Sequence, residues 1–314
     1  MEKEAYLFAI YEILQSETDE NNPLSAVRII EILEDRYSIK IGIKKFYKAI
    51  RVLSGLFKIS PYTENRKGYY LISRQFSKAE VLHLCHAVHS TNSMTPTQIR
   101  NLEDKLLTCL SSCERQEFRE SVYLMNPKNA GNEEWLSNMD QISEAIYRNQ
   151  WIRFDYVHYD INKNLVSRKE PYFREPRFIA FDNMHSYLIT TDDHHKEPTH
   201  FRIDKLRNLK ILKKDIDTTF SIEDAYEYAA SKIFMFAGEN IQAKFKCRIT
   251  QNVFDIMIDE FGMDARFIPI KDDPQHFILS VRASFQGLII FSQKYSDIIT
   301  PVFPEKLVDY FKAD

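Results

Sequence analysis

The sequence predicts a multidomain α+β protein, with helices through most of its first half and mixed strands and helices in its second. Apolar residues recur at three- and four-residue steps up to Arg148, which is the period of amphipathic helices. From Ile152 onward they alternate with polar residues, which is the period of strands. A chain of 314 residues is also too long for one ordinary domain. We therefore expect several domains of different secondary structure.

The first domain is expected at residues 1–75 as a winged helix-turn-helix. Ser25 is a candidate N-cap for the second helix, and only residues 38–42 separate that helix from the third. Two short strands then flank a turn in which Asn65 and Gly68 tolerate left-handed backbone. The three helices and two strands are expected, in chain order, at residues 4–15, 25–37, 43–53, 57–62 and 69–72.

Positive charge is concentrated in a basic strip, which we define as residues 36–74. The strip carries ten Lys or Arg residues against one acidic residue, Glu64, for a net charge of +9, whereas the whole chain has a net charge of −3. A solvated face and a surface that binds a polyanion both fit this charge. Helical spacing favours duplex DNA, because it places several cations on the outer face of the third helix. The predicted DNA contacts are Lys44, Lys45, Tyr47, Lys48 and Arg51 on this helix and Arg66 and Lys67 in the turn of the hairpin.

A helical connector is expected at residues 76–134. Ser77 and Glu80 have the spacing of a capping box at the start of its first helix. A second helix is expected at about residues 96–110, and the polar segment 126–134 is the predicted linker to the next domain.

Two groups of side chains on these helices are of metal-ligand type, but packing is the preferred interpretation for both. The histidines drift around the helix and no carboxylate or cysteine completes their set, and the cysteines form no C-x-x-C pair. The sequence therefore predicts no metal site. The two groups are His83, His86 and His89 on the first helix and Cys109 and Cys113 on the second.

The second half is expected to form two further domains. A helix at residues 135–148 precedes several short strands separated by turns, which predicts a small β-barrel of the SH3 or Sm type at residues 135–215. The C-terminal domain, residues 216–314, is expected as an α+β plait. Asp259 and Glu260 are adjacent on one of its helices, so they point about 100° apart and are not interpreted as a catalytic pair.

No feature of the sequence nominates an enzyme or a cofactor. Glycine-rich phosphate loops, the serine nucleophile elbow and H-E-x-x-H are absent. No apolar run is long enough for a membrane helix, and the polar start of the chain is unlike a signal peptide. We therefore expect a cytoplasmic protein with reduced cysteines.

Four short motifs in the second half resemble the successive motifs of the WYL domain. This resemblance implies a bacterial transcription regulator with an N-terminal winged helix, a WYL barrel and a C-terminal WCX domain. Two positions depart from the pattern: Ser186 replaces the aromatic residue that names the domain, and Lys205 replaces an arginine. The motifs are F-D-Y at 154–156, R-K-E-P-Y at 168–172, H-S-Y-L-I at 185–189 and F-R-I-D-K at 201–205.

The resemblance also implies a ligand, either nucleic acid or a nucleotide, bound by polar and basic residues of the barrel. Guanidinium and ammonium groups suit phosphate, and phenols suit stacking or hydrogen bonding. An alternative is that Arg202 and Asp204 only brace the barrel as an ion pair. The implied ligand residues are Tyr156, Arg168, Tyr187, Arg202 and Lys205, with Ser186 and His200 as neighbours.

Three hypotheses for function follow. The preferred one is a homodimeric regulator that reads operator DNA with its winged helix and is switched by a ligand in the barrel. The second is an accessory protein that senses single-stranded nucleic acid through the barrel and contacts a protein partner through the winged helix. The third, an enzyme acting on nucleotides, has the least support.

Overall fold

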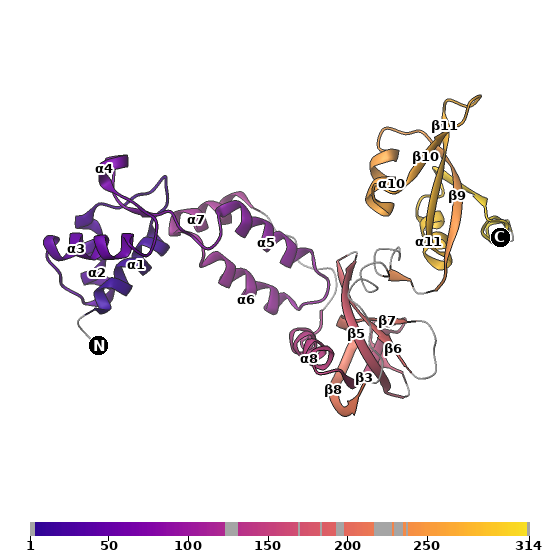
Figure 1. The fold of residues 1–314 in the computed structure, drawn as a ribbon, viewed down its shortest axis with the longest axis horizontal. Helices are drawn as coiled ribbons and strands as arrows, with labels where there is room; N and C mark the ends of the chain where they lie inside the picture. Colours follow the sequence, from indigo (N-terminus) through magenta and orange to yellow (C-terminus); the bar gives the residue numbers. More distant parts are fainter. Residues whose placement is uncertain are drawn as a thin grey trace. The chain divides into compact units, whose positions relative to one another are not determined.

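The computed structural model describes residues 4–122, 131–168, 170–182, 184–192, 198–216, 228, 235, 236 and 238–312. The chain divides into two compact units, Met1–Gly131 and Asn132–Asp314. Their boundary falls within the predicted linker, of which residues 126–130 lie outside the described residues. The mixed α and β multidomain architecture is confirmed (Figure 1). The division into four domains stays a prediction.

The first unit begins with three helices packed around one core. Phe46 of the third helix and Ile13 of the first are fully buried in this core. Ser25 caps the second helix as expected, because its hydroxyl accepts a hydrogen bond from the backbone N–H of Arg28 at 3.2 Å. The helices and the hairpin that follows are α1 Ala5–Glu17, α2 Ala26–Tyr37, α3 Ile43–Ser54, β1 Ile59–Ser60, α4 Tyr62–Asn65 and β2 Tyr70–Leu71.

The hairpin is shorter than predicted. A strand over residues 57–62 was expected, but only Ile59–Ser60 pairs with Tyr70–Leu71, and Tyr62–Asn65 forms one helical turn. The Asn65 side chain explains the difference, since its Oδ1 accepts from the backbone N–H groups of Lys67 at 2.7 Å and Gly68 at 2.9 Å. This side chain closes the turn in place of ladder hydrogen bonds.

Gly68 lies where the hairpin meets the chain before α2, and we expect its replacement by alanine to destabilise this module by about 2 kcal/mol. A Cβ at this position would lie 2.4 Å from the carbonyl oxygen of Leu24, whose backbone pairs with Tyr69. Hydrogen–deuterium exchange of the β2 amides measures the effect. Gly42→Ala is the matched control, because its Cβ would meet nothing within 4 Å. Equal protection of β2 in both variants would contradict this prediction.

Three helices complete the first unit: α5 Lys78–Ser90, α6 Pro96–Leu107 and α7 Ser112–Ser121. Figure 1 shows α5 and α6 side by side. The capping box of Ser77 and Glu80 is present at the start of α5. The placement of both cysteines on one helix was wrong, because Cys109 lies in the turn after α6 and Cys113 lies in α7. Ser111, which lies between the two cysteines, is the N-cap of α7, so a new helix begins there.

The second unit begins with helix α8, Trp135–Tyr147, packed on a curled antiparallel sheet. Its described strands run in the order β4-β3-β5-β6-β7, and β8 pairs with β3. Phe154 and Leu188 are fully buried between sheet and helix. The finer assignment to an SH3 or Sm barrel stays a prediction. The strands are β3 Gln150–Tyr159, β4 Leu165–Ser167, β5 Tyr172–Asp182, β6 His185–Thr191, β7 Thr199–Arg202 and β8 Leu206–Asp215, with the 3-10 turn Ile203–Lys205 before β8.

The last part of the second unit is a four-stranded antiparallel sheet with helices. The strand order is β10-β11-β9-β12, and Phe245 and Phe291 pack in its core. Among the described residues, no helix has the length and apolar character needed to cross a membrane. The elements are β9 Asn240–Arg248, α10 Val253–Phe261, β10 Arg266–Pro269, β11 His276–Ser284, α11 Phe285–Lys294, β12 Ile299–Phe303 and α12 Glu305–Tyr310.

Candidate nucleic-acid interface and ligand pocket

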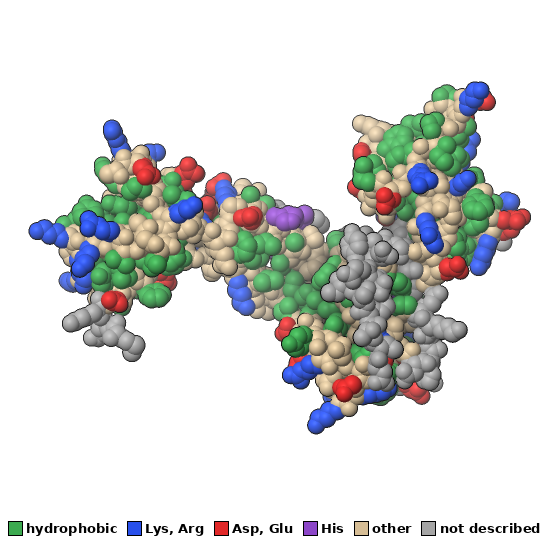
Figure 2. Space-filling model, viewed as in Figure 1, with side chains coloured by type: hydrophobic (Ala, Val, Ile, Leu, Met, Phe, Trp, Pro, Cys, Tyr) green, Lys and Arg blue, Asp and Glu red, His purple; other side chains and the backbone are tan. Residues whose placement is uncertain are grey.

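Helix α3 has one buried face and one cationic face. Phe46 and Leu53 point into the core, whereas Lys44, Lys48 and Arg51 are exposed. Lys and Arg side chains are visible as blue groups over this module in Figure 2. Among the described residues, these three cations make no ion pair. Tyr47, which is 51% exposed, adds an aromatic ring to the same surface.

Four cations of the basic strip have partners within the protein. Arg36 pairs with Glu17 at 2.5 Å, and Lys40 pairs with Glu34 at 2.6 Å. The other two are Lys45, whose Nζ lies 4.3 Å from the ring centroid of Tyr6, and Arg74, whose guanidinium donates to backbone carbonyls. Lys45 was predicted as a DNA contact, but its ammonium is turned toward α1. The strip is therefore less cationic toward solvent than its composition indicates.

The hairpin supplies the other two predicted contacts. Arg66 and Lys67 are both exposed in the turn after α4. Arg66 has φ 56°, a left-handed conformation, and it is the C-cap of that short helix. The Asn65 side chain holds this turn, so the two cations project from a fixed loop.

A pocket of about 620 Å³ opens on the curled sheet of the second unit. Most of its lining comes from the motifs that resemble the WYL domain. The described lining residues are Tyr156, Arg168, Tyr172, Arg174, Tyr187, Thr199, His200, Phe201, Arg202, Met235 and Phe236.

Five of the seven predicted ligand residues meet in this pocket, and two do not. Tyr156, Arg168, Tyr187, His200 and Arg202 line it. The other two predicted side chains, Ser186 and Lys205, lie outside the pocket.

Ser186 is buried at 3% exposure, and it precedes Tyr187 on β6, so it faces the opposite side of the sheet. Lys205 lies in the 3-10 turn, where its Nζ is 3.8 Å from the ring centroid of Tyr159 and 3.9 Å from Asp204 Oδ2. Burial lowers the pKa of the Lys205 ammonium. Both side chains therefore support the sheet from outside the pocket.

The pocket has an aromatic floor that sequence reasoning missed. The rings of Tyr172 and Phe201 lie edge to face at 5.0 Å, and Tyr156 contacts Phe201 at 5.2 Å. Phe154 stacks behind Tyr172 at 5.7 Å. The alternation of side chains along β3 and β5 could have predicted this floor, because every second residue of a strand lies on the same face of the sheet. Such a floor suits a planar, aromatic ligand.

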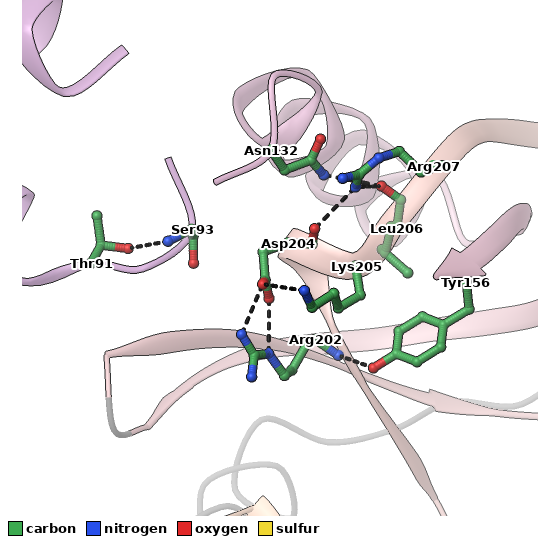
Figure 3. Close-up of polar contacts among 9 residues, drawn as sticks. All are labelled: Thr91, Ser93, Asn132, Tyr156, Arg202, Asp204, Lys205, Leu206 and Arg207. Atoms are coloured by element: carbon green, nitrogen blue, oxygen red, sulfur yellow. Dashed lines mark hydrogen bonds and ion pairs between the residues drawn. The ribbon is translucent and has the colours of Figure 1, made fainter. Parts of the chain in front are cut away.

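Three arginines surround the floor, and two of them already have carboxylate partners. Arg202 binds Asp204 with both ends of its guanidinium, Nε to Oδ1 at 3.0 Å and Nη2 to Oδ2 at 2.8 Å (Figure 3). Arg174 lies 3.1 Å from Asp192 and 5.1 Å from the ring centroid of Tyr172.

Arg168 is the third, and it is exposed. It donates to the hydroxyl of Tyr172 at 2.6 Å and makes no ion pair among the described residues. It is therefore the guanidinium best placed to receive an anionic group.

The phenols of Tyr156 and Tyr187 in the pocket are neutral. Burial raises the pKa of the Tyr156 phenol, and the same cause raises that of Tyr187. The Tyr156 hydroxyl accepts a hydrogen bond from the backbone N–H of Arg202 at 3.3 Å, so its proton is directed elsewhere. His200 Nδ1 lies 2.6 Å from the carbonyl oxygen of Met235, which requires a proton on Nδ1.

The solved structures that match this chain include two of low sequence identity. No protein of curated function matches it. Among solved structures, the proteasome accessory factor B/C (PafBC) of Arthrobacter aurescens is 14% identical, with a TM-score of 0.28 over 99% of this chain and 47% of that chain. The chain thus spans about half the length of PafBC. A CRISPR Cas-related protein is 15% identical, with a TM-score of 0.39 over 96% of this chain and 95% of that one.

A family model does match part of the second unit. The model of the WYL domain matches residues 137–211, from within α8 to within β8. This range includes all four motifs on which the resemblance was based. It also includes every described residue that lines the pocket except Met235 and Phe236. The chain therefore contains a WYL domain, which occupies residues 137–211.

Proposed function

We propose that this protein is a homodimeric transcription regulator that binds duplex DNA through residues 1–75 and is switched by a ligand in its WYL domain. The observation that carries the proposal is the exposed cationic face of α3, where Lys44, Lys48 and Arg51 make no ion pair among the described residues. A surface of this kind is suited to phosphates.

The order of elements supports duplex DNA as the partner. α2 and α3 are joined by a short turn, and a two-stranded hairpin follows, as in a winged helix. A helix fits the major groove, which is about 12 Å wide. In this proposal α3 enters that groove, while Arg66 and Lys67 contact the backbone beside it.

The proposed homodimer follows from what one helix can recognise. A single recognition helix reads only a few base pairs, and two copies spaced by a helical turn of DNA give useful specificity. Whether such a regulator represses or activates transcription depends on where its operator lies.

The WYL-domain pocket supports a nucleotide-like effector. Its aromatic floor, Tyr172 and Phe201, suits a base, and the exposed guanidinium of Arg168 suits a phosphate. Such a ligand changes DNA binding only if it has different affinities for the two DNA-binding states.

The direct test is fluorescence anisotropy with duplex DNA from the upstream region of the protein's own gene, repeated over a range of salt concentrations. We expect affinity to fall steeply as salt rises, since phosphate contacts release counterions. The corresponding single strand is expected to bind more weakly. Equal binding of single and double strands would favour the alternative, in which the WYL domain binds the nucleic acid.

Arg168→Ala is expected to weaken binding of a nucleotide effector about tenfold, because a charge-assisted hydrogen bond to phosphate is lost. Isothermal titration with nucleoside monophosphates and short oligonucleotides measures the affinity. Lys213→Ala is the control, as it removes an exposed cation of β8 that does not line the pocket. The effector assignment is wrong if Arg168→Ala and wild type bind every such ligand equally.

A further inference from the structure

Arg74 ends the basic strip, but its guanidinium faces the protein. Nη1 donates to the carbonyl oxygens of Gln15 at 2.9 Å and Cys109 at 3.1 Å, and Nη2 donates to that of Thr18. Gln15 and Thr18 lie at the C-terminal end of α1, and Cys109 lies in the turn after α6. Carbonyls at helix ends lack intrahelical partners and carry partial negative charge. One side chain therefore joins the ends of two helices.

A buried carboxylate joins the same two regions a second time. Asp19, at 6% exposure, accepts a hydrogen bond from the hydroxyl of Ser111 at 2.5 Å. Its other oxygen accepts from the backbone N–H groups of Asn21 and Asn22, both at 2.9 Å. Ser111 is fully buried and caps α7. The loop after α1 is thus bound to the first turn of α7.

Two further contacts extend this polar junction. The Ser112 hydroxyl donates to Glu17 at 2.8 Å, and Glu17 also pairs with Arg36 of α2. The Thr18 hydroxyl accepts from the backbone N–H of Leu71 in β2 at 3.3 Å. The end of α1 is therefore tied to α2, to β2 and to α7.

We infer that Asp19 and Arg74 are positioning residues that make the three-helix module and the helices α5–α7 one rigid body. Rotation of the module against these helices would separate Asp19 from Ser111 and leave helix-end carbonyls without donors. The orientation of α3 is then set by α5–α7. The inference does not depend on DNA binding, and under the proposed function it means that a signal reaches α3 by moving this whole body.

Distance measurements by electron paramagnetic resonance test the inference on the full-length protein without DNA. Spin labels are placed through noncanonical amino acids at Asp35 in α2 and Arg100 in α6, which are both exposed. Wild type is expected to give one narrow distribution. Asp19→Ala and Arg74→Ala are each expected to widen it about twofold, because the module then reorients.

Two further variants separate this role from charge and from folding. Lys58→Ala removes a cation of the basic strip outside the junction and is expected to keep the wild-type width. Arg74→Lys keeps the charge but replaces the two separated nitrogens that contact the carbonyls by a single one, so it is expected to widen the distribution. If an alanine variant loses helical circular dichroism, Arg74→Lys and Asp19→Asn are measured in its place. A wild-type width in the folded variants of both positions would overturn the inference.

Discussion

Replacing Lys48 and Arg51 together by alanine is expected to weaken binding of duplex DNA about 100-fold, since each contact to a base or phosphate contributes about 1–3 kcal/mol. Both side chains are exposed on α3, and neither has an ion-pair partner among the described residues. The slope of log affinity against log salt is also expected to become shallower by about two. Anisotropy titrations at several salt concentrations measure both quantities.

The control for this prediction is Lys210→Ala with Lys213→Ala, which removes the same charge from β8 in the second unit. This pair is expected to leave duplex affinity within about twofold of wild type, because neither residue lies in the proposed interface. If both double variants lose affinity equally, general charge and not α3 governs binding. Unchanged affinity in the first variant would make the assignment of α3 as recognition helix wrong.

Asp204→Ala is expected to destabilise the WYL domain by about 3 kcal/mol, the lower end of the cost of breaking a buried ion pair. The Asp204 side chain is 3% exposed and accepts both hydrogen bonds of Arg202, whose own side chain is 30% exposed. The partial exposure of Arg202 limits the cost, since water can solvate the guanidinium left behind.

Tryptophan fluorescence during urea unfolding reports on α8 and the curled sheet, because the chain's two tryptophans, Trp135 and Trp151, lie at the start of α8 and in β3. Arg202→Ala with Asp204→Ala is expected to be no less stable than Asp204→Ala alone, since the double variant no longer contains the Arg202 guanidinium that Asp204→Ala leaves unpaired. Asp215→Ala, an exposed carboxylate of β8, serves as control with a change below about 0.5 kcal/mol. A comparably small change for Asp204→Ala would show that the pair does not brace the sheet.

These variants also separate the two roles considered for Arg202. Loss of stability without loss of nucleotide affinity in Arg202→Ala favours bracing alone. Loss of affinity at wild-type stability favours ligand contact alone. The bidentate geometry with Asp204 makes bracing the stronger expectation, and it leaves Arg168 as the main anion contact of the proposed effector site.

Local patterns in the sequence were enough to predict much of the architecture. The helices α1 to α3, the capping box of Ser77 and Glu80, and the strands of the WYL domain follow from periodicity and from residues three or four apart. The hairpin was less predictable, because the Asn65 side chain competes with the ladder for backbone groups. The WYL domain itself was recognised from short motifs, and the match to residues 137–211 confirms it.

The partners of individual charges required the tertiary structure. Lys45 and Arg74 belong to the basic strip by sequence alone. In the structure Lys45 packs on the ring of Tyr6, and Arg74 donates to the backbone carbonyls of Gln15 and Cys109. Lys205 likewise lies over Tyr159, outside the pocket where the motif placed it. Helix and strand periods depend on neighbouring residues, so the sequence alone reveals which residues share a face. The charge that a face presents depends on partners far away in the chain, and only the packed structure identifies them.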